Sequence, residues 1–212
     1  MNMEKKFELT DNFIINAFGV KLFQIKCTKS FKYAKEGDLG GYVEKDENLD
    51  QESDAWVSGD AWVSGDARVS GDAWVSGDAW VYGNAEVSGD ARVYGNARVS
   101  GNAEVSGDAR VYGNARVSGN ARVSGDARVY GDAEIDNNNK HCGFDCFGSA
   151  NRHTHAYLTK ENKVEITCGC FRGSIEEFEK RVEETHSGTI YEKQYKAIID
   201  VIKIKFGLTD LI

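Results

Sequence analysis

Valine recurs at every sixth position through the middle of the chain, from Val57 to Val129, and the series ends at Ile135. Between two valines, each phrase carries Ser or Tyr, then Gly, Asp or Asn, Ala, and one variable residue. Neighbours in a strand point to opposite faces, so the valine points inward and the residues beside it point outward. The glycine supplies the positive φ of a tight corner, which Asp or Asn also tolerates. The pattern predicts short strands joined by corners.

Strands this short bury their apolar side chains only by stacking on copies of themselves. The phrases VSGDAW and VYGNAR resemble the hexapeptide-repeat family in their aliphatic and small positions, although Ser or Tyr after the valine departs from its second position. This resemblance implies a left-handed parallel β-helix, triangular in section, with three phrases per coil. Every third phrase then lies on the same face of the prism.

The fold class predicted for the chain is mainly β, in three parts. Residues 1–42 contain strand-like segments (KFELT, NFIIN, VKLFQIKC) and are predicted to form an N-terminal β cap. Residues 43–139 form the β-helix, with a small loop at DQESD. Residues 140–212 form a C-terminal ββαα domain: RHTHAYLT and KVEITCGC make a hairpin, and capping boxes at Ser174 and Thr189 open two helices.

The variable residue decorates the three faces differently. On face one it reads Trp, Trp, Arg, Arg, Arg, and on face two Trp, Trp, Arg, Arg, Glu. On face three, Arg68 is expected to pair with Glu86, and Glu104 with Arg122, in a solvated wall.

Face one carries the main candidate for a binding surface. Three arginines stacked about 4.8 Å apart repel one another, and three tyrosines run beside them. Guanidinium groups bind carboxylate or phosphate in a fork, which predicts recognition of an acidic protein surface or a phosphorylated ligand. In the alternative, the arginines stack on the tyrosines, the corner residues Asp60, Asp78 and Asp132 supply the countercharge, and nothing binds. We name these residues the Arg–Tyr wall: Arg92, Arg110, Arg128, Tyr94, Tyr112 and Tyr130.

Four tryptophans lie on two adjoining faces at one end of the prism: Trp56, Trp62, Trp74 and Trp80. Outward tryptophan in a soluble protein is normally covered. One interpretation is that the N-terminal segment folds back over this Trp block. The other is an interface with a second subunit or a partner, where tryptophan is enriched.

The C-terminal segment holds the candidate metal ligands. If the hairpin turns at Glu161 and Asn162, His155 faces Cys168 and His153 faces Cys170 on one side of the sheet. Two cysteines and two histidines can bind zinc. The spacing is not a standard zinc pattern, and buried core side chains are the alternative. No other cofactor is expected.

Composition narrows the functional classes. The net charge of −8 disfavours generic binding to nucleic acid. The sequence contains no run of eighteen apolar residues, so no membrane span is predicted. The N-terminus lacks the apolar stretch of a signal peptide. An odd number of cysteines, five, argues against a disulfide framework. We therefore expect a cytoplasmic protein.

Many hexapeptide proteins are acyltransferases, but no histidine occurs from Ala55 to Asn139, so the usual general base is missing from the coils. The chain is therefore expected not to be an enzyme. The layout also resembles uncharacterised hexapeptide proteins of phages and prophages in GDLGGYVEKDENL, in the WVSGDAWV run and in the segment Cys168–His186. This resemblance implies that the cytoplasm is that of a bacterial host.

The hypothesis is a non-enzymatic binding protein that inhibits a host component, such as a host defence system, with a host protein as partner. The alternatives are a sponge for a small phosphorylated signal and a structural virion or assembly component. As hexapeptide relatives are commonly trimers, a homo-oligomer, trimer or dimer, is expected.

Overall fold

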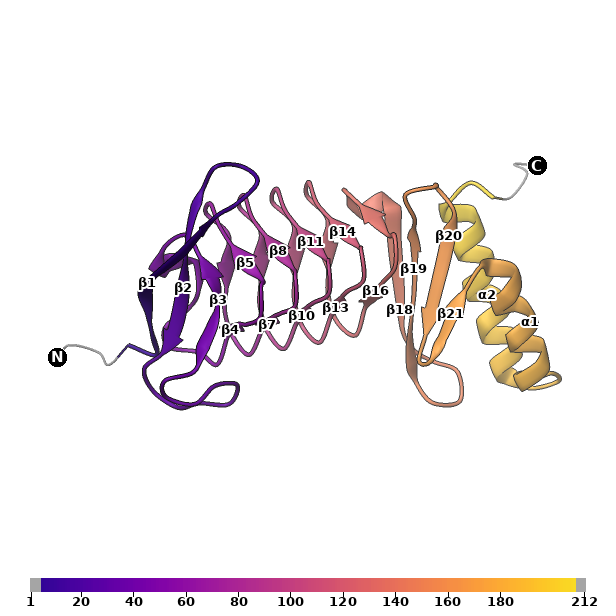
Figure 1. Ribbon diagram of the computed structural model, residues 1–212. Helices are drawn as coiled ribbons and strands as arrows, with labels where there is room; N and C mark the ends of the chain where they lie inside the picture. The colour runs from indigo at the N-terminus through magenta and orange to yellow at the C-terminus, as the bar shows by residue number, and fades with distance from the viewer. Residues whose placement is uncertain (1–4, 209–212) are drawn as a thin grey trace.

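The computed structural model describes residues 5–208, which form an elongated rod (Figure 1). A strand cap lies at one end of the rod, coils of short strands fill the middle, and a sheet covered by two helices lies at the other end. Among the described residues, no helix is both long enough and apolar enough to cross a membrane.

The coils consist of fourteen strands of two residues each, β4 to β17, which fall into three sheets. Face one holds β4 (Trp56–Val57), β7 (Trp74–Val75), β10 (Arg92–Val93), β13 (Arg110–Val111) and β16 (Arg128–Val129). Face two holds β5 (Trp62–Val63), β8 (Trp80–Val81), β11 (Arg98–Val99), β14 (Arg116–Val117) and β17 (Glu134–Ile135). Face three holds β6 (Arg68–Val69), β9 (Glu86–Val87), β12 (Glu104–Val105) and β15 (Arg122–Val123).

Neighbouring strands in each of these sheets are parallel. Val57 pairs with Val75 on face one, for example, and Val69 pairs with Val87 on face three. Arg92 lies beside Arg110, so the variable residues of one face form a row along the rod. The prediction of a mainly β chain with a parallel β-solenoid is confirmed, and the solenoid has about five turns.

The interior of the solenoid is filled by the valine and alanine of each phrase, which are almost completely buried from Ala55 to Ile135. The corner glycines have φ angles between 62° (Gly119) and 77° (Gly83). A Cβ atom on Gly89 would lie 2.9 Å from the backbone nitrogen of Gly107 in the next coil. The corner therefore needs glycine both for its backbone conformation and for the close approach of successive coils.

The N-terminal cap is an antiparallel arrangement of β1 (Phe7–Ile15), β2 (Lys21–Cys27) and β3 (Leu39–Val43). Strand β3 pairs in parallel with β5, so the cap extends the sheet of face two. A short 3-10 helix, η1 (Asp46–Asn48), follows. The buried ammonium of Lys6 donates hydrogen bonds to the carbonyl oxygens of Ser53 and Ala55, at 2.6 Å and 2.8 Å, at the start of the first coil.

The C-terminal module has four antiparallel strands where the sequence predicted two. A 3-10 helix, η2 (Asn138–Lys140), leads into it. The predicted hairpin is present, with one further strand added on each side. In sheet order the strands are β18 (His141–Phe147), β19 (Arg152–Leu158), β20 (Val164–Cys168) and β21 (Phe171–Gly173). One side of this sheet packs against α1 (Ile175–His186) and α2 (Ile190–Lys205).

Both helices begin where the sequence predicted. Ser174 accepts a hydrogen bond from the backbone N–H of Glu177, whose carboxylate accepts one from Ser174, so this capping box is complete. Thr189 caps α2 in the same way, but the Glu192 carboxylate accepts its bond from Gly188 instead.

The other side of the module closes the last coil. The Thr167 hydroxyl donates to the carbonyl oxygen of Arg128 at 3.2 Å. The Tyr157 hydroxyl lies 3.4 Å from the carbonyl oxygen of Tyr130 and donates its proton to the Glu165 carboxylate at 2.8 Å. The backbone N–H of Lys160 donates to the carbonyl oxygen of Asp132 at 2.9 Å. The end of a solenoid exposes backbone polar groups that have no further coil to bind, and the Thr167 hydroxyl and the Lys160 N–H satisfy two of them.

Candidate functional site

The N-terminal cap covers much of the Trp block. Trp56 is 3% exposed and Trp62 is 4% exposed. The ring of Phe31 packs edge-on against Trp56 at a centroid distance of 5.3 Å, and Phe18 does the same to Trp62 at 6.2 Å. Two of the four tryptophans proposed as contact residues are therefore interior side chains, because the chain's own N-terminal segment folds over them.

The other two tryptophans are half-buried. Trp74 stacks on Tyr33 of the cap, with ring centroids 5.9 Å apart, and its indole N–H donates to the Ser58 hydroxyl at 2.9 Å. Trp80 has the Arg98 guanidinium over its ring at 3.8 Å. Each tryptophan of the block thus has a partner within the described chain.

The Arg–Tyr wall is assembled as a ladder. Tyr94 stacks on Tyr112 at a centroid distance of 4.8 Å, and Tyr112 lies 4.5 Å from Tyr130 at a tilt of 43°. Arg92, Arg110 and Arg128 form the parallel row on the other side of the valines. The six residues therefore lie on one face, with guanidinium groups and phenols in adjacent rows.

The last arginine and the last tyrosine of the Arg–Tyr wall make contacts within the molecule. Arg128 donates from Nη1 to the carbonyl oxygen of Gly169 at 2.8 Å. The guanidinium of Arg172, from the C-terminal module, lies over the Tyr130 ring at 4.0 Å. This leaves Arg92 and Arg110, both exposed, as the open cations of the wall, beside the half-buried Tyr94 and Tyr112.

Within residues 5–208, no carboxylate lies within 4.0 Å of the Arg92 or Arg110 guanidinium, and the expected countercharge from the corner aspartates is not in place. Asp132 instead accepts a hydrogen bond from the Asn114 amide at 3.2 Å. Burial, and next the neighbouring Tyr112, raise the pKa of Tyr94, so its phenol stays protonated and can donate a hydrogen bond.

Face three behaves differently. Arg122 and Glu104 form an ion pair at 3.0 Å, as the sequence predicted. Arg68 and Glu86 lie opposite each other in the sheet, but no ion pair joins them in the described part of the chain.

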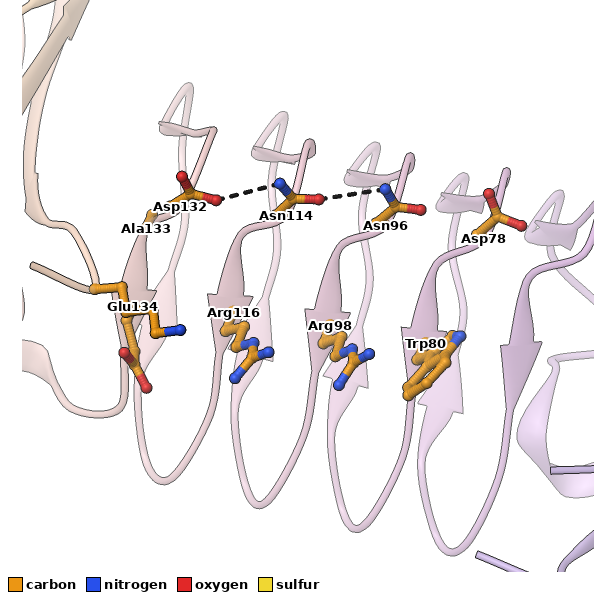
Figure 2. Close-up of a pocket in the computed structure, with 10 residues that line it drawn as sticks. Asp78, Trp80, Asn96, Arg98, Asn114, Arg116, Asp132, Ala133 and Glu134 are labelled. Atoms are coloured by element: carbon orange, nitrogen blue, oxygen red, sulfur yellow. Dashed lines mark hydrogen bonds between the residues drawn. The ribbon is translucent and has the colours of Figure 1, made fainter. Parts of the chain in front are cut away.

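A polar groove of about 440 Å³ on face two was missed by the sequence analysis (Figure 2). Its edge is a hydrogen-bonded row in which Asn96 donates to Asn114 at 3.2 Å and Asn114 donates to Asp132. Arg98 and Arg116 project beside this row. Lys160 of the C-terminal module also lines the groove. The sequence signal for this groove was the presence of Asn in place of Asp at the same corner in two successive coils.

This groove adjoins the Arg–Tyr wall, because the asparagine row is the corner between faces one and two. Neutral amides replace carboxylates there in two successive coils, Asn96 and Asn114. In these two coils the corner carries no negative charge, whereas Asp78 and Asp132 occupy the same corner in the coils on either side.

The four candidate zinc ligands are not brought together. The predicted register, with His155 opposite Cys168, is wrong by one residue: Thr154 pairs with Cys168, and His155 pairs with Thr167. The hairpin loop is closed by the Thr159 N–H donating to the Lys163 carbonyl, which leaves an odd number of residues in the turn. A shift of one residue reverses the face to which a side chain points.

As a result, Cys168 belongs to the core beneath the helices and Cys170 is exposed, whereas His155 faces the last coil. His153 Nδ1 lies 2.5 Å from the Asp145 carboxylate. Among residues 5–208, no group of three or more His, Cys, Asp or Glu side chains is arranged to hold a metal ion.

The histidines instead form part of the junction between solenoid and module. His155 Nε2 lies 3.0 Å from His141 Nδ1. Burial lowers the pKa of His155 to about 3 and that of His141 to about 4. Both rings are therefore neutral near pH 7, which suits two imidazoles that share one hydrogen bond.

Comparison with known families identifies the repeat. Segments 61–77, 91–107, 103–119, 109–125 and 121–133 match the family described as YdcK Beta solenoid repeat. Together with the observed solenoid, this match supports a β-helix repeat family for this part of the chain. A search of curated proteins found no match.

Proposed function

We propose that this is a non-enzymatic binding protein that uses the open part of the Arg–Tyr wall to contact an acidic surface on a partner protein. The observation that carries the proposal is the row of Arg92 and Arg110, exposed and without a carboxylate within 4.0 Å in the described chain. Tyr94 and Tyr112 run beside them as a stacked platform. A surface of this kind offers forked donors and flat apolar rings together.

The energetics favour an acidic partner. Two like unit charges 4 Å apart in water repel by about 1 kcal/mol, so the row of arginines on successive coils is slightly destabilised by charge repulsion. A carboxylate placed between two guanidinium groups removes that repulsion and accepts charge-assisted hydrogen bonds worth about 1.5–3 kcal/mol each. The rigid coils hold the arginines in register, which lowers the entropy lost on binding.

The wider setting is part of the same proposal. The resemblance to phage and prophage hexapeptide proteins supports a host protein as partner, an inhibitory role and a bacterial cytoplasm. The absence of histidine from Ala55 to Asn139 supports a role without acyl transfer. The 18-residue step from Val57 to Val75 supports a winding of three phrases per coil, and the family resemblance supports its left-handed sense and a homo-oligomer.

The test is a pull-down from bacterial lysate, followed by affinity measurement with the captured partner. Arg92→Glu combined with Arg110→Glu is expected to weaken binding at least a hundredfold, because each substitution replaces attraction by repulsion. The matched control is Arg68→Glu combined with Arg122→Glu on face three, which changes the net charge equally.

Raised salt should weaken wild-type binding in parallel. Equal binding by the wild type and the face-one variant would remove the Arg–Tyr wall as the contact surface. A loss that is equal in both double variants would show that net charge, rather than this wall, governs binding.

A further inference from the structure

A separate cavity of about 330 Å³ lies in the C-terminal module, away from the solenoid faces. It opens between the sheet and the two helices. Its lining comes from β19, β20, β21, α1 and α2 and from the turn between β20 and β21, which holds Cys170.

The floor of the cavity is aromatic. Phe171 and Phe178 have ring centroids 5.0 Å apart, and Phe178 meets Tyr195 edge-on at 5.6 Å. The His186 ring stacks on the Tyr195 ring, with centroids 5.5 Å apart. Flat side chains arranged around an apolar hollow favour a flat apolar group as occupant.

The rim of the cavity is cationic. Arg152 and Arg181 line it, and no acidic side chain does. Neither guanidinium has a carboxylate within 4.0 Å among residues 5–208. Both are exposed, so they remain hydrated and can turn toward an anion at the mouth. Unpaired guanidinium groups beside an apolar floor suit a ligand with an anionic head and an apolar body.

The Tyr195 hydroxyl packs against the backbone of Gly148, which leaves no room for a Cβ atom there, so Tyr195 contributes its ring to the floor. Burial, and next the nearby Cys168, raise the pKa of Tyr195 to about 12, so its hydroxyl keeps its proton. Its nearest sulfur contact, Cys168 Sγ at 3.8 Å, is long and weak.

We propose that this cavity binds a small aromatic anion, with the ring on the Phe171–Phe178 floor and the carboxylate or phosphate between Arg152 and Arg181. The volume lies at the lower end of the range for ligand sites, about 300–1,000 Å³, which limits the occupant to a compact molecule. This site is independent of the Arg–Tyr wall, because it belongs to a different part of the chain.

Cys170 provides the readout. It is an exposed thiol that lines the cavity, whereas Cys146 is an exposed thiol that does not. The experiment measures the alkylation rate of each cysteine in the full chain by mass spectrometry, with phenyl phosphate or phenylacetate as probe. The expected result is that one of the probes slows alkylation of Cys170 at least about fivefold and leaves Cys146 unchanged.

Substitution then locates the anion. Arg181→Gln is expected to raise the half-protecting probe concentration about tenfold, since it removes a charge-assisted hydrogen bond. Its matched control is Lys180→Gln, which removes the same charge from the neighbouring exposed position on α1 and should have no effect. Melting curves of both variants verify that the module stays folded.

Three results would overturn this proposal: no selective protection of Cys170 by either probe up to 10 mM (about the weakest binding of interest), equal protection by inorganic phosphate, or equal behaviour of the two variants. The second result would mean that the aromatic floor contributes nothing.

Discussion

Trp62 and Arg116 occupy the same place in the repeated phrase, on the same face of the solenoid. Trp62 is buried beneath the N-terminal cap, where it contacts Phe18 and stacks on Trp80 at 5.0 Å. Arg116 is exposed along the polar groove. The backbone of the two phrases is equivalent, and only their surroundings differ.

This comparison explains why one letter of the phrase varies. Valine, glycine and alanine build the coil and are kept from phrase to phrase, with Ile135 in place of the last valine, because the interior and the corners are the same in each turn. On faces one and two the outward residue instead changes along the rod: tryptophan lies beneath or beside the cap, and arginine occupies the coils beyond it. On these two faces the variable letter thus separates a half of the solenoid that is covered by the cap from a half whose arginines are mostly exposed.

The largest expected effect comes from truncating each residue of this pair. Trp62→Ala should lower the free energy of unfolding by about 3–5 kcal/mol, because it leaves a cavity between the cap and the first coils. Arg116→Ala should change it by less than about 0.5 kcal/mol, as expected for an exposed side chain. Urea denaturation followed by circular dichroism measures both. Similar losses in the two variants would contradict the division into a covered and an open half.

A smaller effect on stability is expected at the junction between the last coil and the C-terminal module. The pKa of His155 is about 3 in the folded chain and about 6.5 in an unfolded one, so between these values the unfolded state binds more protons. Stability should therefore fall as the pH drops below 6.5, by at most about 1.4 kcal/mol per pH unit for this residue. His141 contributes in the same direction.

His155→Gln should flatten this dependence, because it removes the buried imidazole whose pKa is lowered. Thermal unfolding between pH 4 and pH 7 provides the measurement. A wild-type slope no steeper than that of His155→Gln would show that the junction does not control acid stability.

The smallest effect concerns face three, where charges are already balanced. A double-mutant cycle on Glu104 and Arg122 should give a coupling energy of about 0.2–1 kcal/mol, typical of an exposed ion pair. The same cycle on Arg68 and Glu86, which form no ion pair, should give a value near zero. The reverse order would mean that the ion pair at 3.0 Å does not govern the coupling.

The solenoid was predictable because its signal repeats. A six-residue period with invariant apolar, small and corner positions allows one kind of structure, and the observed strands coincide with it phrase by phrase. The helices α1 and α2 were predictable for a local reason, since their caps and apolar stripes lie within a few residues of each other.

The candidate site was predictable only in part. Stacking every third phrase correctly placed Arg92 beside Arg110 and Tyr94 beside Tyr112. It gave no sign that Arg172 would cover Tyr130 or that Gly169 would accept a hydrogen bond from Arg128. Those contacts join segments some 40 residues apart, and no periodicity connects them.

The hairpin of the C-terminal module shows the same limit at finer scale. The sequence identified both strands and the turn, but the predicted register was wrong by one residue. Cys168 therefore lies on the side of the sheet opposite His155, not on the same side as predicted. Register depends on how the loop closes and on which face is buried, and both are decided when the sheet packs against the last coil and the helices.

The sequence by itself determined the coil, its faces and the rows of residues along them, because short-range periodicity fixes which side chains point outward. Only the tertiary structure decided which of these side chains stay accessible. Trp56 and Trp62 are taken up by the N-terminal cap, and Arg128 and Tyr130 by the C-terminal module, since both ends of a solenoid expose surface that must be covered. Arg92 and Arg110 remain open between them because neither cap extends that far.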